Sequence, residues 1–217
     1  MSKFNFEFNK HNIKRILMTT LGVLLGGFAV GFFNISGFGA DPFQVFVQGI
    51  NNFSPLDFGT TYTIVNALEL ILIFFMDKKK IGLGTVINIF LLGYVVDFSE
   101  STLRTLVGCG DSDPAMWLRI IFLLIGVIVI SLSAAIYFVP QMGVSTHDAI
   151  SLYISEKQSK VKFQYCRIIN DVIDVVIGVI LGARFGVGTL IAAFGMGPLI
   201  AFFRRTIAEP ILYGRKK

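Results

Sequence analysis

Four charged or amide side chains stand close together within one apolar stretch, residues 163–183. Arg167, Asp171 and Asp174 are spaced by four and three positions, so they share one helix face, and Asn170 lies beside them. Charged groups inside a membrane are costly and usually face a bundle interior or water. Arg167 can neutralise Asp171 within the helix or snorkel toward the membrane surface, and Asp174 is left without a local partner. The spacing predicts a site that favours a cation or takes up protons.

A second apolar stretch, residues 59–76, carries a matching polar face. Tyr62, Asn66 and Glu69 follow the same i, i+4, i+7 spacing. Buried amides either hold a polar ligand or join helices by hydrogen bonds, whereas a lone carboxylate facing lipid is hard to tolerate. We therefore predict a midplane polar cavity between the two stretches, which binds a substrate or ion through Tyr62, Asn66, Glu69, Arg167, Asn170, Asp171 and Asp174.

Two short segments, 42–53 and 147–157, each begin like a helix. Asp41 and Ser145 are good N-caps, and Pro42 suits a first helical turn. Gln44 and Asp148 occupy the reciprocal position of a capping box, three residues after each cap.

The two segments are too short to span a bilayer, which needs about 20 residues. Each either lies flat at the interface or dips inward and points its partly positive N-terminus at a substrate cavity, where it could act as a gate. His147 accordingly either titrates within the site or is solvated at the interface. Asn88 and Asp97 are weaker candidates for the cavity.

The composition indicates a chain solvated by lipid. Hydrophobic residues make up 54% and charged residues 15%, against about 45–50% and about 25% in soluble domains. Six apolar runs are long enough to span a bilayer. They predict an all-α membrane protein with six transmembrane helices, over 16–35, 59–76, 82–103, 117–139, 163–183 and 186–203.

The positive charges are distributed unevenly between the two sides of this bundle. If the N-terminus is inside, fifteen of nineteen Lys and Arg residues fall in cytoplasmic segments, and only Arg104, Arg119 and Arg184 lie outside. We expect both termini to be cytoplasmic. The surplus of +5 is then a topology signal, and we expect no nucleic-acid partner. The first apolar run is full length, so it reads as a retained helix rather than a signal peptide.

The chain aligns with itself at a shift of 104 residues, with fifteen identities over positions 22–102. Gly, Asn and Thr carry much of this signal, as in the paired turns Gly82–Thr85 and Gly186–Thr189, which we expect to be tight turns with a threonine cap. Each copy holds an odd number of spans, so the second copy must be inverted. We predict one membrane domain, 1–217, of repeats at about 16–103 and 117–207, an architecture typical of secondary transporters.

Small residues four apart indicate close helix packing at Gly22/Gly26, Gly27/Gly31 and Gly178/Gly182. The two His and two Cys residues form no nucleophile–base pair or metal-ligand cluster by spacing, and Cys109 and Cys166 fall in different segments. We expect no enzyme activity, no disulfide, no metal and no cofactor.

With these motifs in place, the chain resembles the YczE/YyaS/YitT-like family of bacterial integral membrane proteins. The segments GFGADPF (37–43) and IGLGTVINIFLLGYVVDF (81–98) carry the resemblance, which extends from about Leu21 to Phe203. It implies the same fold and a bacterial cytoplasmic membrane, and it brings no site residues with it.

The leading hypothesis is a small-solute transporter, or permease, coupled to protons or cations. The alternative is a non-transporting membrane partner, such as a substrate-binding subunit or scaffold, with residues 155–162 as its docking surface. The expected partners are the lipid bilayer and a small-molecule or ion substrate. The sequence leaves open whether the chain forms a homo-oligomer or binds a partner protein.

Overall fold

The computed structural model describes residues 10–56, 58–109, 114–158, 161–183 and 185–214, and this part of the chain is helical with no strand. Six basic residues that entered the prediction of orientation lie outside it: Lys3, Lys160, Arg184, Arg215, Lys216 and Lys217. The elements are α1 (Lys10–Ser36), α2 (Pro42–Asn51), α3 (Phe58–Asp77), η1 (Lys78–Lys80), α4 (Leu83–Val107), α5 (Met116–Phe138), α6 (Thr146–Lys157), α7 (Phe163–Ile180), α8 (Val187–Phe203), η2 (Arg204–Ala208) and α9 (Glu209–Tyr213).

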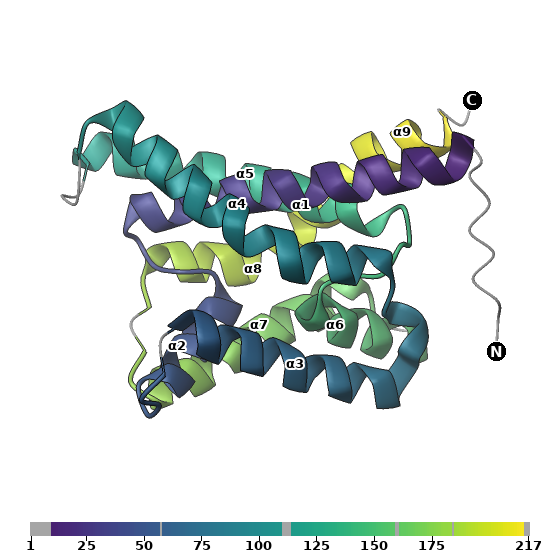
Figure 1. The fold of residues 1–217 in the computed structure, drawn as a ribbon, viewed down its shortest axis with the longest axis horizontal. Helices are drawn as coiled ribbons and strands as arrows, with labels where there is room; N and C mark the ends of the chain where they lie inside the picture. The colour runs from purple at the N-terminus through teal and green to yellow at the C-terminus, as the bar shows by residue number, and fades with distance from the viewer. Residues whose placement is uncertain (1–9, 57, 110–113, 159–160, 184, 215–217) are drawn as a thin grey trace.

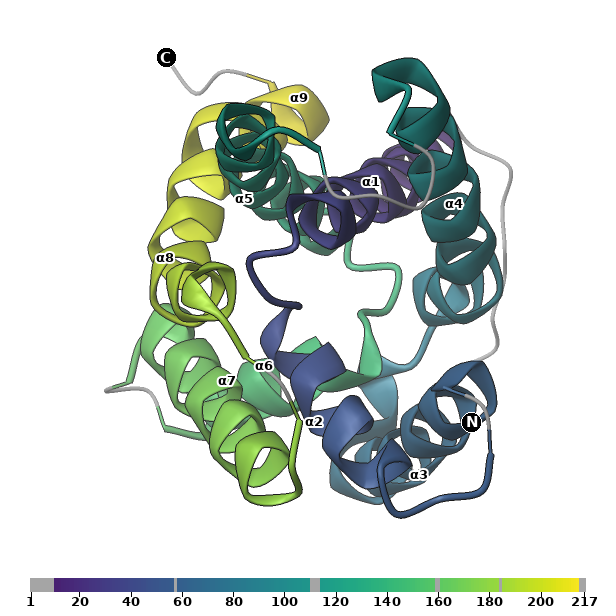
Figure 2. The ribbon, with the colours of Figure 1, turned by 90° about the vertical axis from the view of Figure 1, so that its left-hand side faces the viewer.

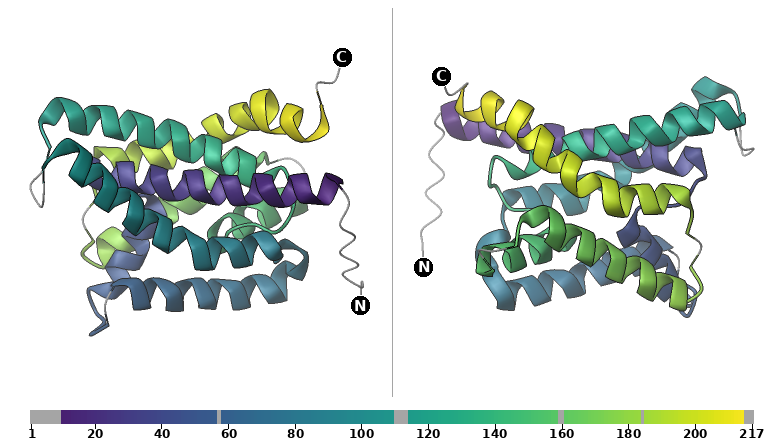
Figure 3. Two further views of the ribbon diagram at one scale, coloured as in Figure 1. Left: turned by 45° about the horizontal axis from the view of Figure 1, so that its top comes forward. Right: turned by 180° about the vertical axis from the view of Figure 1, so that it is seen from behind.

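The long helices run roughly side by side, and each runs opposite to the long helix before it in the chain (Figure 1). Seen along their axes, α1, α4, α3, α7, α8 and α5 form a ring, and the short helices α2 and α6 lie inside it (Figure 2). The start of α1 and the end of α9 lie at the same end of the bundle, as two further views show (Figure 3).

The prediction of an all-α membrane protein is confirmed. Among the described residues, five helices are long and apolar enough to cross a bilayer: α1, α3, α4, α5, and α8 with its continuation through α9. The remaining long helix, α7, has 18 residues and carries Arg167, Asp171 and Asp174. The chain is therefore a polytopic membrane protein.

The six predicted apolar runs are all helices, with two differences at the ends of the chain. Helix α1 begins six residues before the apolar run, at Lys10. Arg15 belongs to this added part, and its Nε donates to the Pro140 carbonyl at 2.7 Å. This tertiary hydrogen bond stabilises the polar first turns of α1. After Phe203 the chain continues as a π-helical turn and α9, whose Leu212 belongs to the same buried apolar cluster as Met18.

Helices α1 and α5 form the centre of the packing, because α1 presents small residues on two faces. An added Cβ at Gly22 would lie 2.9 Å from the Tyr137 backbone, and one at Gly26 2.9 Å from Ser133 Oγ, both on α5. On the other face, Gly27 and Gly31 lie against α4. The predicted glycine faces on α1 are thus packing faces.

Several contacts occur twice, with both partners displaced by 104 residues. The Gly84 N–H donates to the Met142 carbonyl at 2.6 Å, and the Gly188 N–H donates to the Phe38 carbonyl at 2.8 Å. Two further pairs of bonds follow the same rule: Thr85 Oγ1 to Val144 O at 2.8 Å with Thr189 Oγ1 to Ala40 O at 2.7 Å, and Arg15 Nε to Pro140 O at 2.7 Å with Arg119 Nε to Ser36 O at 2.8 Å. Each segment before a short helix is therefore held by the first turn of α4 or α8 from the other half of the chain.

The two predicted threonine caps form. Thr85 Oγ1 accepts from the Gly82 N–H at 3.2 Å, and Thr189 Oγ1 accepts from the Gly186 N–H at 3.4 Å. The same two hydroxyls donate to the opposite half, so each threonine links its own turn to the other half.

Candidate functional site

A cavity of about 400 Å³ lies where the two short helices begin, and it falls within the range of about 300–1,000 Å³ typical of ligand pockets. The cavity had been expected between α3 and α7. Helices α2 and α6 occupy that space instead, since each packs against both α3 and α7. The cavity lies on their other side, bounded by α1, α4, α5 and part of α3.

The first turns of α2 and α6 meet at the cavity wall. The rings of Phe43 and His147, which are 104 positions apart, have centroids 5.2 Å from each other. Of the two placements considered for the short helices, the structure has them inside the ring of long helices (Figure 2). Both helix N-termini therefore point at the cavity.

Local capping explains why these helices start there. The Asp41 carboxylate accepts from the Gln44 N–H at 3.4 Å, and Ser145 Oγ accepts from the Asp148 N–H at 3.2 Å. Pro42 is buried in the first turn of α2. The Asp148 side chain accepts from the hydroxyl of the cap residue, Ser145, at 2.6 Å, whereas a capping box would use the Ser145 backbone N–H, and it also pairs with Arg167.

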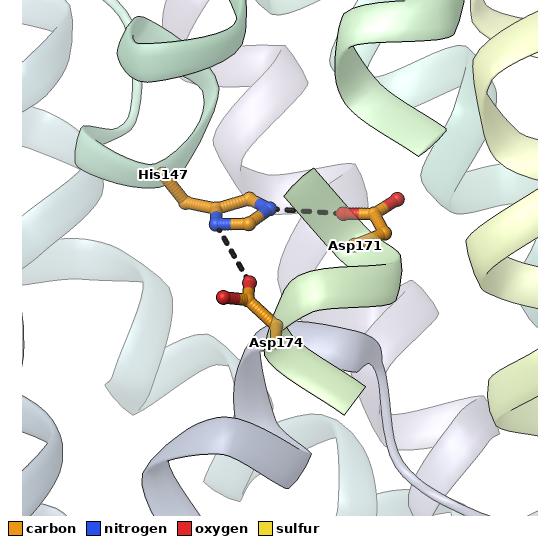
Figure 4. Close-up of side chains that lie close together, drawn as sticks. All are labelled: His147, Asp171 and Asp174. Carbon is orange, nitrogen blue, oxygen red and sulfur yellow. Dashed lines mark hydrogen bonds and ion pairs between the residues drawn. The ribbon is translucent and has the colours of Figure 1, made fainter. Parts of the chain in front are cut away.

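His147 lies between two aspartates of α7 (Figure 4). Its Nε2 is 3.0 Å from Asp171 Oδ1, and its Nδ1 is 3.2 Å from Asp174 Oδ2. Asn170 Nδ2 also approaches Nδ1, at 3.2 Å. His147 and Asp174 are 6% and 8% exposed, and Asp171 is fully buried.

Arg167 closes the other side of this cluster. Its Nε donates to Asp171 Oδ2 at 3.3 Å, so the predicted pair within the helix forms, and its guanidinium also pairs with Asp148 of α6. The side chain is buried and does not snorkel. The cluster thus holds three buried carboxylates and one guanidinium, which pairs with Asp148 and Asp171 but not with Asp174, so it carries excess negative charge unless protons or a cation balance it.

Asp174 is the carboxylate with the weakest compensation. Its Oδ2 lies at ion-pair distance from His147 but accepts no hydrogen bond from any described residue. Two proton arrangements satisfy the ring. A protonated imidazole donates to Asp171 and forms an ion pair with Asp174, whereas a neutral ring donates to Asp171 and accepts at Nδ1 from Asn170 or from a protonated Asp174. The site can therefore hold an exchangeable proton.

The same three side chains are close enough for a metal ion, because their ligand atoms all lie within 4.8 Å of one another. The spacing of the His and Cys residues does not reveal this group, because two of its three members are aspartates. In this orientation the two ring nitrogens face different aspartates (Figure 4).

Thr146 joins the polar face of α3 to α6, and nothing in the sequence singled it out. Its Oγ1 lies 2.9 Å from Asn66 Oδ1 and 2.8 Å from Glu69 Oε2, and one hydroxyl can donate to only one of them at a time. Asn66 Nδ2 also donates to the Tyr62 carbonyl at 2.9 Å. The α3 and α7 polar faces thus converge on the first two residues of α6.

The predicted site residues fall into two layers. Tyr62, Asn66, Arg167, Asp41, Gln44, Ser145, His147 and Asp148 line the cavity, as do Asn88 and Asp97. Glu69, Asn170, Asp171 and Asp174 do not line it and lie behind Thr146 and His147, which do. Thr146 and His147 of the cavity wall thus contact the carboxylates behind it directly: Thr146 contacts Glu69, and His147 contacts Asp171 and Asp174.

This fold and site define a polytopic helical membrane protein with a charged cluster buried beside a cavity at the junction of two short helices. The chain belongs to DUF6198, a family of unknown function whose model matches residues 13–205. It is 26% identical over 194 residues to an uncharacterised protein of Haemophilus influenzae, covering 89% of this chain and 84% of that protein.

It is also 23% identical over 197 residues to the uncharacterised protein YyaS of Bacillus subtilis, covering 91% of this chain and 96% of that protein. The predicted resemblance to a YyaS-like family is confirmed. No solved structure matches the chain.

Proposed function

We propose that the protein is a proton-coupled transporter of a small solute, built from two inverted repeats that together supply six transmembrane helices. The repeated contacts at a spacing of 104 residues support the duplication. The opposite directions of α1 and α5, of α3 and α7, and of α4 and α8 support the inversion (Figure 1). In this arrangement α7 is the sixth span, with Asp171 and Asp174 turned into the bundle.

The observation that carries the proposal is the position of His147. The imidazole lines the cavity on one side and contacts Asp171 and Asp174 on the other. When the His147–Asp174 pair gains or releases a proton, the charge at the cavity wall changes, and hence the affinity for a charged or polar solute. By linkage, solute binding must then change the proton affinity of the pair by the same factor, and coupled transport requires such a coupling.

The short helices serve as the gates in this proposal. Broken or half-length helices whose N-termini meet at the midplane are a recurrent feature of secondary transporters. The protein would lie in the bacterial cytoplasmic membrane with both termini inside. The basic elements η1 and η2 lie at the end of the bundle where α1 begins, which agrees with that orientation (Figure 1).

Flux in proteoliposomes tests the proposal. The vesicles would contain a pH-sensitive dye and receive gradients of choline, methylammonium, putrescine and neutral polar solutes in turn. We expect one class to drive a protein-dependent pH change that is lost in Asp174→Asn and reduced in Glu69→Gln. Glu209→Gln is the control, because Glu209 forms an exposed pair with Arg204 at 3.0 Å, far from the cluster.

An unchanged rate in the Asp174→Asn, Glu69→Gln double variant would remove the cluster from the mechanism. Solute binding without any flux would instead favour the alternative, a substrate-binding subunit of a larger complex.

A further inference from the structure

The two halves of the bundle differ at one interface. Helix α7 packs against α8, whereas the equivalent helices of the first half, α3 and α4, make no comparable packing in their described residues. The helices α3 and α4 are nevertheless neighbours around the ring (Figure 2). We call the boundary between them the α3–α4 seam.

Two glycines 104 positions apart show the same difference at atomic scale. A Cβ at Gly197 of α8 would lie 3.0 Å from the Gln164 carbonyl oxygen of α7, so the boundary between α7 and α8 is closed around Gly197. A Cβ at Gly93 of α4 would meet no atom within 4 Å. The seam is therefore open at the position where its counterpart is tightly packed.

The cavity extends to this opening. Its lining includes Tyr62 and Asn66 of α3 together with Leu92, Gly93 and Asp97 of α4. The outer faces of both helices carry large exposed apolar side chains, among them Leu68, Phe75, Phe90, Tyr94 and Phe98. Such faces belong against lipid, so the seam connects the cavity to the acyl region of the bilayer sideways.

The chemistry of the cavity favours one kind of molecule. Asp41, Asp97 and Asp148 line it together with one guanidinium, that of Arg167, which pairs with Asp148, so carboxylates outnumber guanidinium groups at the wall and the wall suits a cation. The remaining wall is largely apolar, formed by Val23, Val30, Leu92, Val96, Ile130 and Met196. A positively charged head would find carboxylates inside, and an attached hydrocarbon chain would find apolar side chains along the path to the seam.

Building on the transport function proposed above, we propose that the α3–α4 seam is a lateral portal and that the substrate is an amphipathic organic cation which enters from the bilayer. The portal gives the apolar part of such a molecule a continuous route from lipid to cavity. Asp97, one helical turn from Gly93 and exposed, is the first carboxylate that its head would meet.

Thiol labelling tests the portal without requiring transport. Gly93→Cys and Gly195→Cys would be made in a chain carrying Cys109→Ser and Cys166→Ser, reconstituted in vesicles and labelled with N-phenylmaleimide. Gly195 of α8 is the matched control, because a Cβ there meets no atom closer than 4.0 Å and it does not line the cavity. The probes would be decyltrimethylammonium, tetramethylammonium and decyl sulfate at equal concentration.

We expect decyltrimethylammonium to slow labelling at Gly93→Cys by about tenfold when its concentration is about ten times its Kd, since protection scales as one plus the concentration over Kd. Tetramethylammonium lacks the chain and decyl sulfate has the opposite charge, so neither should protect at that concentration. Labelling at Gly195→Cys should not change. Adding Asp97→Asn should weaken protection at Gly93→Cys several-fold.

Equal protection by decyl sulfate, equal protection at Gly195→Cys, or no protection by any probe would overturn the inference. These outcomes are separate from failure of the transport function. Selective protection without proton-coupled flux would reject transport alone, and proton-coupled flux of choline without protection would reject the portal alone.

Discussion

The Nε2 atom of His147 lies 3.0 Å from Oδ1 of Asp171, and the second oxygen of that carboxylate accepts from Arg167 at 3.3 Å. Asp171 is thus fully engaged, whereas Asp174 Oδ2, one turn along α7, accepts no hydrogen bond in the described structure. The two aspartates should therefore respond differently to the same substitution.

Asp171→Asn should destabilise the protein strongly. The amide cannot balance the charge of Arg167, and removing one partner of a buried ion pair costs about 3–5 kcal/mol. The melting temperature in detergent would measure the loss, with Asp97→Asn on an exposed part of α4 as the control. Equal melting temperatures for the two variants would contradict this account of the cluster.

Asp174→Asn should leave stability unchanged or raise it by about 1 kcal/mol, because it removes a buried charge whose Oδ2 makes no hydrogen bond. The same variant should lose solute-driven proton flux. Thermal melting and proteoliposome assays on one preparation would check both results. A clear drop in melting temperature would show that the ion pair with His147 is structural.

Thr85→Val and Thr189→Val should destabilise the protein to a similar extent. Each hydroxyl donates to a carbonyl of the opposite half at 2.8 and 2.7 Å, and leaving such buried groups unpaired costs about 1–3 kcal/mol. Thr105→Val is the matched control, since that hydroxyl is exposed and bonds only within its own helix. Unequal losses in the two variants would indicate that the two contacts differ in strength despite their similar geometry.

Gly39→Ala and Gly143→Ala should prevent folding. Their φ angles are +116° and +99°, and an added Cβ would lie 2.7 Å from the Gly186 nitrogen and 2.5 Å from the Gly82 nitrogen. We expect no monodisperse protein by size-exclusion chromatography. Gly195→Ala, with open space around it, should behave as the parent chain. Normal yields of Gly143→Ala would show that the segment before α6 can shift.

Labelling intact cells with a membrane-impermeant maleimide tests the orientation. Cys109 follows α4 at the end of the bundle opposite η1, and Cys166 is buried, so Cys109 should react from outside. Gln158→Cys in a Cys109→Ser chain is exposed at the other end and should react only after the membrane is permeabilised. The reverse pattern would place both termini outside.

Local features were predictable, because they depend on neighbouring residues. Asp41 and Ser145 cap α2 and α6 as expected, and Arg167 pairs with Asp171 across one turn. The glycine spacing in α1 also indicated its packing faces. Each of these follows from helical periodicity and capping chemistry alone.

Contacts between distant segments were not predictable in the same way. Thr146 bonds to α3 only because α6 lies between α3 and α7, and sequence periodicity does not report that placement. Arg15 and Arg119 are identical residues 104 positions apart, so the internal alignment relates them to each other. It does not indicate that each bonds to a carbonyl near the start of a short helix.

The bonds from Gly84 to Met142 and from Gly188 to Phe38 pass between the halves in both directions. A free-standing half would therefore leave the amide at the start of its last helix unsatisfied, along with the carbonyl that ends its first loop. Under the duplication proposed above, a second copy in the opposite orientation would supply both groups. A single ancestral unit would then have to insert in both orientations and assemble as an antiparallel dimer before the two genes fused.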